Sequence, residues 1–383
     1  MFDIVAKFPD KAWLDATAEK LNKKLQYAVK KSQENDFIPY AAGKDGNFQR
    51  TNIRMWTNGF WPAMMWQMYL ATKDETYRAE AIRTEEMMDE ALADFKTLHH
   101  DVGFMWLIHC AVRYKLEGNQ ESYDRAYFAA WTLAARFNPK GFIRAWNGKD
   151  QQGWAIIDCM MNLPLLYWAS EMTNDPRFKL IAMQHADTAM KHFVRDDGSV
   201  KHIVVFDPET GEEIDNLGGQ GYEKGSSWSR GQSWALYGFT LSYLCTGKKE
   251  YLDTAKKVAN YFITNCASDW IPRCDFRQPA DPDLKDNAAG AIASCGLLEL
   301  AKAVDECEAR PYYNAAVNML MAMEKNCTNW DNDIPAVFNK CTVAYHQYPG
   351  RHSTMNYADY YFVEAINKLR GQELNFWMPS KQG

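Results

Sequence analysis

The sequence predicts an all-α protein in which helical hairpins close into a ring. Three observations predict this fold. Long segments repeat apolar residues with the i, i+3, i+4, i+7 spacing of a helix that buries one face. Short polar turns separate many of these segments. Similar helix openings recur along the chain at the scale of a helical hairpin, which is typical of a helical array.

The periodic segments, taken in order, predict twelve helices. They cover residues 12–34, 58–72, 75–98, 103–116, 121–137, 156–173, 176–193, 229–246, 249–266, 287–303, 310–326 and 356–370. The clearest polar turns between them are 73–75, 117–119, 173–176 and 246–249. Twelve helices make six hairpins, which we expect to close as a six-hairpin toroid. An open solenoid is the alternative shape.

Several of these helices open alike, with an aromatic residue four positions before an alanine. The pairs are Tyr77 with Ala81, Phe178 with Ala182, Tyr251 with Ala255 and Tyr312 with Ala316. A large and a small side chain on the same helix face favour close packing between helices. We therefore expect these pairs to lie inside the protein.

Composition limits the possible partners and location. The chain has 383 residues and a net charge of -6, without the basic stripe of a nucleic-acid-binding protein. Residues 1–10 lack the features of a secretion signal, and no apolar run reaches membrane-spanning length. The sequence predicts a cytoplasmic protein with no nucleic-acid or membrane partner. We expect one domain over 1–383, with a short N-terminal segment packed on the ring, as a monomer or homodimer.

The nine cysteines show no disulfide or metal framework. Their number is odd, their spacings are irregular, and no C-x-x-C pair occurs. Most lie in apolar helical surroundings, where cysteine behaves as a small core residue. We expect reduced core thiols, and the pattern does not fit a zinc finger or a thioredoxin-like site.

The longest helix-free stretches are predicted to wall a site at one end of the ring. They cover residues 139–155, 196–228, 267–285 and 327–357. Long connections in a compact domain are usually functional or disordered, and the abundant aromatic and polar residues here favour function. A β-rich run at 200–206, followed by a turn at 207–211, predicts a small hairpin.

Asp101 is a candidate acid at a helix start, directly after His99 and His100. Two histidines and an aspartate can indicate a metal site. Adjacent histidines are expected to point in different directions, however, and the usual helical metal pair is i, i+4. The pattern leaves open whether Asp101 is a helix cap or a catalytic group.

Asp158 is a stronger candidate, because it interrupts the apolar stretch 154–163. Burying a carboxylate there costs several kcal/mol unless the group is paired or protonated. Burial also raises its pKa towards the range useful for proton transfer. A structural hydrogen bond or helix cap is the alternative role.

Aromatic and polar side chains around a later helix start suggest a site for an acidic sugar. Trp146 and Trp234 lie beside polar loop residues and can stack on sugar C–H faces. Arg230 offers a fork that matches a carboxylate, and helix N-termini attract anions. His202 and Gln220 precede it in the same loop. The alternative is an ordinary helix start with a surface arginine.

Short motifs along most of the chain resemble glycoside hydrolase family 88, the unsaturated glucuronyl hydrolases. They lie at 56–61, 100–104, 141–146, 156–159, 206–211, 220–222, 227–234 and 359–365. Each motif is weak alone, but their order and spacing are specific. The chain departs from the family pattern at 286–291 and at Ala358. After His346 it lacks the Ser-x-Lys of members that favour sulfated chondroitin disaccharides, so no sulfate preference is implied.

The resemblance implies an (α/α)6 barrel that uses neither metal nor organic cofactor. It implies hydration of the C4=C5 vinyl ether in the terminal uronic acid of lyase-generated di- or oligosaccharides. Asp158 would protonate C4 and activate water, and Asp101 would hold the sugar hydroxyls. The implied substrate-binding residues are Trp56, His100, Trp146, His202, Gln220, Arg230, Trp234 and His346.

Three other functions fit parts of the pattern. A family 105 unsaturated rhamnogalacturonyl hydrolase would share the fold and chemistry but act on pectin-derived substrates. A sugar epimerase on a similar toroid would need two histidine bases facing the pocket. A carbohydrate-binding repeat protein would expose aromatic residues without burying an aspartate.

Overall fold

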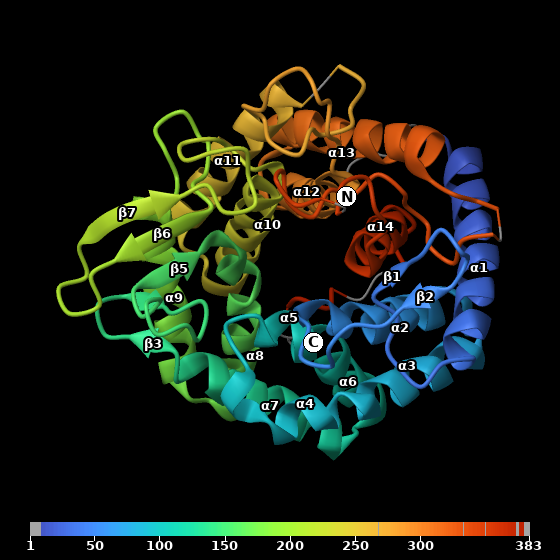
Figure 1. Ribbon diagram of the computed structural model, residues 1–383, viewed down its shortest axis with the longest axis horizontal. Coiled ribbons are helices and arrows are strands. Elements are labelled where there is room, and N and C mark those ends of the chain that lie inside the picture. Colours follow the sequence, from blue (N-terminus) through green and yellow to red (C-terminus); the bar gives the residue numbers. More distant parts are fainter. Residues whose placement is uncertain (1–8, 267, 332, 349, 373–374, 379–383) are drawn as a thin grey trace.

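Helices alternate between an outer and an inner ring along the chain (Figure 1). The computed structural model describes residues 9–266, 268–331, 333–348, 350–372 and 375–378. The outer helices are α1 (Lys11–Gln33), α3 (Glu75–Met87), α7 (Gln120–Ala134), α9 (Pro176–His192), α11 (Lys249–Asn265) and α13 (Glu306–Cys327). The inner helices include α2 (Phe60–Thr72), α5 (Val102–Trp106), α8 (Leu163–Thr173), α10 (Ser229–Thr246), α12 (Asn287–Ala303) and α14 (Asn356–Leu369).

The ring closes between the two ends of the chain. The last inner helix, α14, packs against α2 as well as α12, and α1 contacts both α14 and α3. These contacts confirm the toroid and exclude the open solenoid. Most of the N-terminal segment, which was predicted to precede the helix at 12–34, lies outside the described residues.

Burial explains why two helix types alternate. The inner helix α12 is buried from Asn287 to Ala301, because other elements surround it. The outer helix α11 buries one face, which includes Tyr251, Ala255 and Phe262. A helix that is apolar all round belongs inside, and an amphipathic one covers it. All four aromatic–alanine pairs are buried, as the sequence predicts.

Two predicted helices are broken where they approach the loop end. The segment predicted at 75–98 forms α3, then α4 (Asp89–Ala93) and the 3-10 turn η3 (Phe95–Thr97). The segment predicted at 156–173 begins as strand β5 (Trp154–Ile156) and the 3-10 turn η5 (Ile157–Met161) before α8. Short apolar runs do not distinguish a strand from a buried helix.

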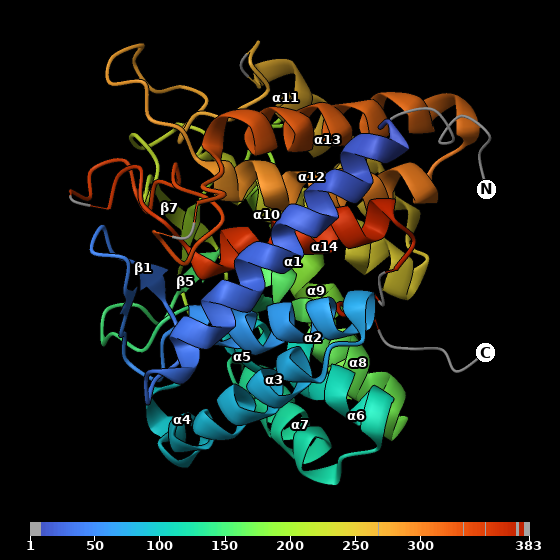
Figure 2. The ribbon, with the colours of Figure 1, turned by 90° about the vertical axis from the view of Figure 1, so that its right-hand side faces the viewer.

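A small antiparallel sheet forms on the loop side. Strand β6 (Ile203–Phe206) pairs with β7 (Glu213–Leu217), which confirms the predicted hairpin, and β5 joins its other edge. Two-residue strand pairs are β1 (Ala41–Ala42) with β2 (Phe48–Gln49) and β3 (Phe137–Asn138) with β4 (Phe142–Ile143). Strands and long loops gather at one side of the helices (Figure 2).

Shorter helical turns connect the helices of the inner ring. The 3-10 turn η2 (Trp56–Gly59) leads into α2, and a π-helical turn, η4 (Leu107–Ala111), joins α5 to α6 (Val112–Glu117). The nine cysteines, all among the described residues, form no disulfide, and most are buried, as predicted. Among the helices of the described ranges, none combines the length and apolar character that a membrane span needs.

Candidate active site

The chain brings Asp101 and Asp158 together through one buried amide. Asp101 precedes α5, and Asp158 lies in η5. The Asn162 side chain donates from Nδ2 to Asp101 Oδ1 (3.3 Å) and to the Asp158 carbonyl oxygen (3.3 Å). Its Oδ1 accepts from the Phe104 N–H at 2.9 Å. Both aspartates are nearly buried, at 7% and 9% exposed.

Backbone pairing places His202 beside Asp158. Strands β5 and β6 align Ile156 with Ile203, and the Ile157 N–H donates to the His202 carbonyl oxygen at 3.1 Å. The side chains of Asp158 and His202, just beyond these pairs, therefore lie next to each other at the end of the sheet. His202 Nε2 lies 3.6 Å from Asp158 Oδ1.

The backbone of the following loop holds the His202 ring. Its Nδ1 lies 3.0 Å from the Gln220 N–H and 3.3 Å from the Gly218 carbonyl oxygen, so Nε2 is left facing Asp158. Burial lowers the pKa of His202 to about 3, so the ring is neutral at pH 7. Gly219 packs on this ring with φ +59°, and a Cβ there would lie 2.1 Å from Nδ1. Only glycine fits this close approach.

Asp101 stands at the N-cap position of α5 but does not act as a cap. Its side chain accepts no capping hydrogen bond. Its Oδ1 lies 3.1 Å from His100 Nε2, and its Oδ2 lies 3.4 Å from His99 Nδ1. The carboxyl group is thus directed at His99 and His100, and the helix-cap alternative is excluded.

Burial makes Asp158 a weak acid. The dry surroundings and, next, the Asp101 charge raise the pKa of Asp158 to about 8, while Arg230 and the Trp234 indole N–H lower it. Burial also raises the pKa of Asp101, which His99 and Asn162 partly offset. A carboxyl with such a pKa is protonated at pH 7 and can act as a general acid.

Arg230 belongs to the framework of this site. It is 1% exposed and forms an ion pair with Asp286. It also donates to the carbonyl oxygens of Thr342 (3.0 Å) and Val343 (2.6 Å). Its guanidinium lies 4.5 Å from the centre of the Trp228 ring. The alternative of a surface arginine is excluded. Much of the guanidinium group, which was predicted to bind a substrate carboxylate, already pairs with Asp286 and two carbonyl oxygens.

Aromatic rings form one wall of the site. The half-buried Trp56 contacts Trp234 and Tyr357, with ring centroids 6.4 and 4.9 Å apart. Trp234 is fully buried and also packs on Phe104 at 5.1 Å. Trp146 lies on another side, 6.0 Å from the His100 ring, and is half-buried.

Gln220 and His346 tie two loops together at the rim. Gln220 Nε2 donates to the Val343 carbonyl oxygen at 2.8 Å. His346 Nε2 donates to the Tyr222 carbonyl oxygen at 2.6 Å, and its side chain is exposed. His346 therefore lies farther out than the other predicted residues, and no contact joins it to either aspartate among the described residues.

Several buried polar atoms meet here without a partner. Among the described residues, Asp158 Oδ1, His100 Nε2 and His202 Nε2 make no hydrogen bond. Unsatisfied buried groups are rare in folded proteins and need an explanation such as a missing ligand or water. Their convergence on the two aspartates marks a binding site for a polar molecule.

Sequence reasoning did not identify Asn162 and Asp286. Both are fully buried polar residues. Asn162 ends the apolar run that contains Asp158, so the burial argument applied to Asp158 could have found it. Asp286 was noted only as part of a departure from the family pattern, because its partner Arg230 is 56 positions away.

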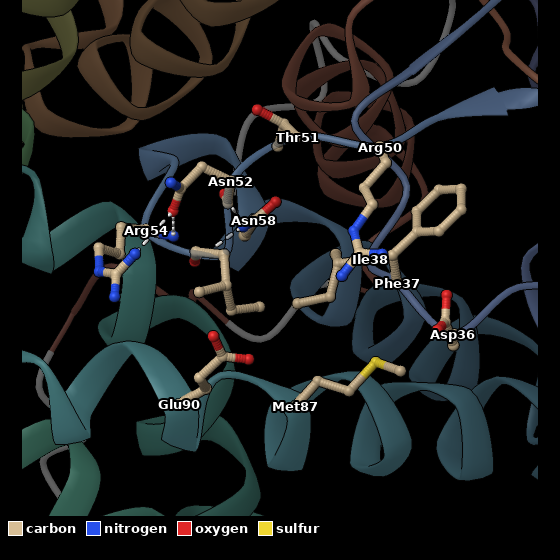
Figure 3. Close-up of a pocket in the computed structure, with 11 residues that line it drawn as sticks. Asp36, Phe37, Ile38, Arg50, Thr51, Asn52, Arg54, Asn58, Met87 and Glu90 are labelled. Carbon is tan, nitrogen blue, oxygen red and sulfur yellow. Dashed lines mark hydrogen bonds between the residues drawn. The ribbon is translucent and has the colours of Figure 1, made fainter.

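A second cavity lies behind the η2 turn (Figure 3). It measures about 380 Å³, and neither Asp101 nor Asp158 lines it. Arg50 and Glu90 both line it, and Asn58 forms part of its wall. Because Asn58 follows Trp56 in the same turn, this cavity and the aromatic wall share η2.

Comparison with known proteins finds relatives along most of the chain. The sequence profile of Glycosyl Hydrolase Family 88 matches residues 27–376. An unsaturated glucuronyl hydrolase of Bacillus sp. (strain GL1) is 35% identical, over 89% of this chain and 93% of the relative. An unsaturated chondroitin disaccharide hydrolase of Streptococcus pyogenes serotype M1 is 32% identical, over 94% and 93%.

The fold comparison agrees with the sequence comparison. A solved structure described as a UGL variant with dGlcA-Glc-Rha-Glc superposes with a TM-score of 0.90 and 30% identity. The match covers 95% of this chain and 100% of that one.

Proposed function

The chain belongs to glycosyl hydrolase family 88, and from that premise we propose that Asp158 is its proton donor and Asp101 its main substrate-orienting carboxyl. The enzyme releases the unsaturated uronic acid from the non-reducing end of oligosaccharides. These relatives favour this activity over the family 105, epimerase and binding-repeat alternatives.

The substrate reacts as a vinyl ether. Its uronic acid ring has a C4=C5 double bond beside the ring oxygen. A proton added at C4 leaves positive charge at C5, which the ring oxygen stabilises. Water adds at C5 and loses a proton, giving a hemiketal. Opening the C5–O5 bond leaves a ketone at C5, and the new hemiacetal at C1 then expels the remaining saccharide.

Asp158 suits both proton transfers in the hydration step. Its pKa of about 8 leaves it protonated at pH 7, ready to give a proton to C4. The carboxylate that results is basic enough to take the proton from the attacking water, which regenerates the acid. Because water attacks C5 and not the anomeric carbon, the usual relation between carboxyl separation and stereochemistry does not apply.

His202 and Arg230 support this role of Asp158. His202 Nε2 lies 3.6 Å from the carboxyl group, close enough for the ring to contact the charge that forms on Asp158. The buried Arg230 lowers the pKa of Asp158 and so limits the rise caused by burial. We assign Arg230 to the electrostatics of the site and to attraction of the acidic sugar.

The remaining predicted residues surround the sugar. Asp101 and His100 offer adjacent polar atoms for hydroxyl groups, with Asn162 holding the aspartate in place. The wall formed by Trp56 and Trp234, and the Trp146 ring opposite His100, can stack on sugar faces. Gln220 and His346 shape the rim, where the rest of the saccharide leaves.

The observation that carries this proposal is the set of unpartnered buried atoms around Asp158. The test follows loss of the ultraviolet absorbance of C4=C5 in unsaturated disaccharides from chondroitin, hyaluronan, heparin and gellan. We expect Asp158→Asn to lower turnover by at least about 10²–10⁴-fold, the usual contribution of a general acid or base.

The matched control is Asp253→Asn, at an exposed position of the outer helix α11. It should retain the wild-type rate. Retained turnover in Asp158→Asn, with circular dichroism showing an intact fold, would exclude Asp158 as the proton donor.

A further inference from the structure

The residues around Asp101 place metal-binding atoms together. His99 Nδ1, His100 Nε2 and an Asp101 carboxylate oxygen all lie within 4.8 Å of one another. The sequence argument that adjacent histidines diverge is therefore wrong here. It holds for regular strands, but these residues lie in the irregular turn that leads into α5.

Both nitrogens lie near the distance from the Asp101 carboxyl group that a small tetrahedral cation requires. Asp101 Oδ1 lies 3.1 Å from His100 Nε2, and Asp101 Oδ2 lies 3.4 Å from His99 Nδ1. With Zn–N near 2.0–2.1 Å and Zn–O near 2.0–2.2 Å, tetrahedral ligand atoms are about 3.3–3.5 Å apart. The three ligand atoms, which lie within 4.8 Å of one another, would move closer together around the ion. The His99 Nδ1 contact with the Asp101 N–H, at 3.5 Å, is long and would be exchanged for the metal.

His100 is oriented as a metal ligand would be. Its Nδ1–H donates to the Ala145 carbonyl oxygen at 2.9 Å, which leaves the lone pair on Nε2. His100 is 1% exposed, and its Nε2 has no hydrogen-bond partner among the described residues. A buried, unpartnered nitrogen directed at a carboxylate is an independent indication of a ligand.

The other group of possible metal ligands, Glu85 with His109 and Cys110, has a carboxylate that is already paired. Glu85 already accepts from Arg125 at 3.1 Å and from Arg113 at 3.3 Å. Its charge is neutralised by arginines, and a cation there would have to displace them. Of the two groups found in the described ranges, the one at Asp101 is the better built.

We propose that His99, His100 and Asp101 form a site for Zn²⁺ or a similar divalent transition-metal ion, and that the bound ion inhibits the enzyme. The fourth coordination position is left for water. The inhibition rests on the proposed function, because the ion occupies the carboxylate assigned to the sugar hydroxyls. Zn²⁺ therefore competes with the substrate.

The first test measures binding without turnover. Isothermal titration of the whole enzyme with Zn²⁺ should detect a site that His99→Ala weakens by about 10–100-fold, as loss of one supporting group typically does. The controls are His352→Ala, an exposed histidine, and Cys307→Ser, an exposed thiol. Both should bind Zn²⁺ as the wild type does. Equal affinity of wild type and His99→Ala would overturn the proposal.

The second test measures inhibition against an unsaturated disaccharide. Zn²⁺ should raise the apparent KM and leave kcat unchanged, and His99→Ala should need about 10–100-fold more Zn²⁺ for the same effect. A fall in kcat at constant KM would overturn the competitive mechanism. If no disaccharide is turned over but calorimetry still detects the His99-dependent site, the proposed function fails and the metal site stands.

Discussion

Replacing Asp158 with asparagine should stabilise the fold while it abolishes catalysis. The Asp158 carboxyl is buried, and its pKa in the folded protein is about 8, against an ordinary value of 3.8. Between these two values the unfolded chain carries the charge and the folded chain does not. Unfolding then releases a proton, so stability falls as the pH rises through this window. Asparagine has nearly the same shape and does not titrate.

The size of the effect follows from the pKa difference. At pH 7 the unfolded carboxyl is about three pH units above its pKa, and each unit corresponds to about 1.4 kcal/mol. Burial of the titratable carboxyl therefore lowers the free energy of unfolding at pH 7 by at most about 4 kcal/mol, and the variant does not have this cost. The amide of asparagine must itself find hydrogen bonds, so we expect a gain of about 2–4 kcal/mol at pH 7. The gain should vanish near pH 4.

Urea unfolding of both proteins, followed by circular dichroism from pH 4 to 8, measures this difference. The control is Asp253→Asn, whose exposed side chain is in water in both states and should change stability by less than about 0.5 kcal/mol. A stability difference that does not vary with pH would refute the dry-site reasoning. A variant that is less stable than wild type at every pH would refute it as well.

Three further outcomes are expected. The kcat/KM for an unsaturated disaccharide should fall above about pH 8 as Asp158 loses its proton, and a profile that stays flat to pH 9 would contradict this. Asn162→Ala should lower kcat by about 10–100-fold and leave the fold intact, because Asp101 loses its link to the Asp158 segment. A change in KM alone, measured by steady-state kinetics, would contradict this prediction. Gly219→Ala should displace the His202 ring and reduce turnover by at least about 10-fold, whereas the exposed Gly225→Ala, also at positive φ but with open space, should not.

The helices and the core residues could be predicted from the sequence because they depend on the pattern of nearby residues. The period of apolar residues sets which face of a helix is buried, and the aromatic–alanine pairs of the outer helices are inside as expected. Errors arose where a segment changes type near the site. The run around Ile156 begins as a strand because β6 pairs with it, and that partner lies 47 positions along the chain.

The proposed acid could also be predicted from the sequence. Asp158 interrupts an apolar run, so burial and a raised pKa followed from its neighbours in sequence. The role of Asp101 was not decidable in that way, because a helix N-terminus suits both a cap and a catalyst. Only the tertiary structure shows that its oxygens face His100 and Asn162 and do not cap the helix.

The sequence by itself thus determined a helical ring, its loop-built end and a buried carboxyl group at position 158. The tertiary structure alone decided which polar atoms meet: Asn162 with Asp101, Arg230 with Asp286, and the two adjacent histidines with one carboxylate. The physical reason is distance along the chain. Hydrophobic periodicity acts over a few residues, whereas a hydrogen bond or ion pair between residues 56 or 61 positions apart exists only once packing has fixed the backbone.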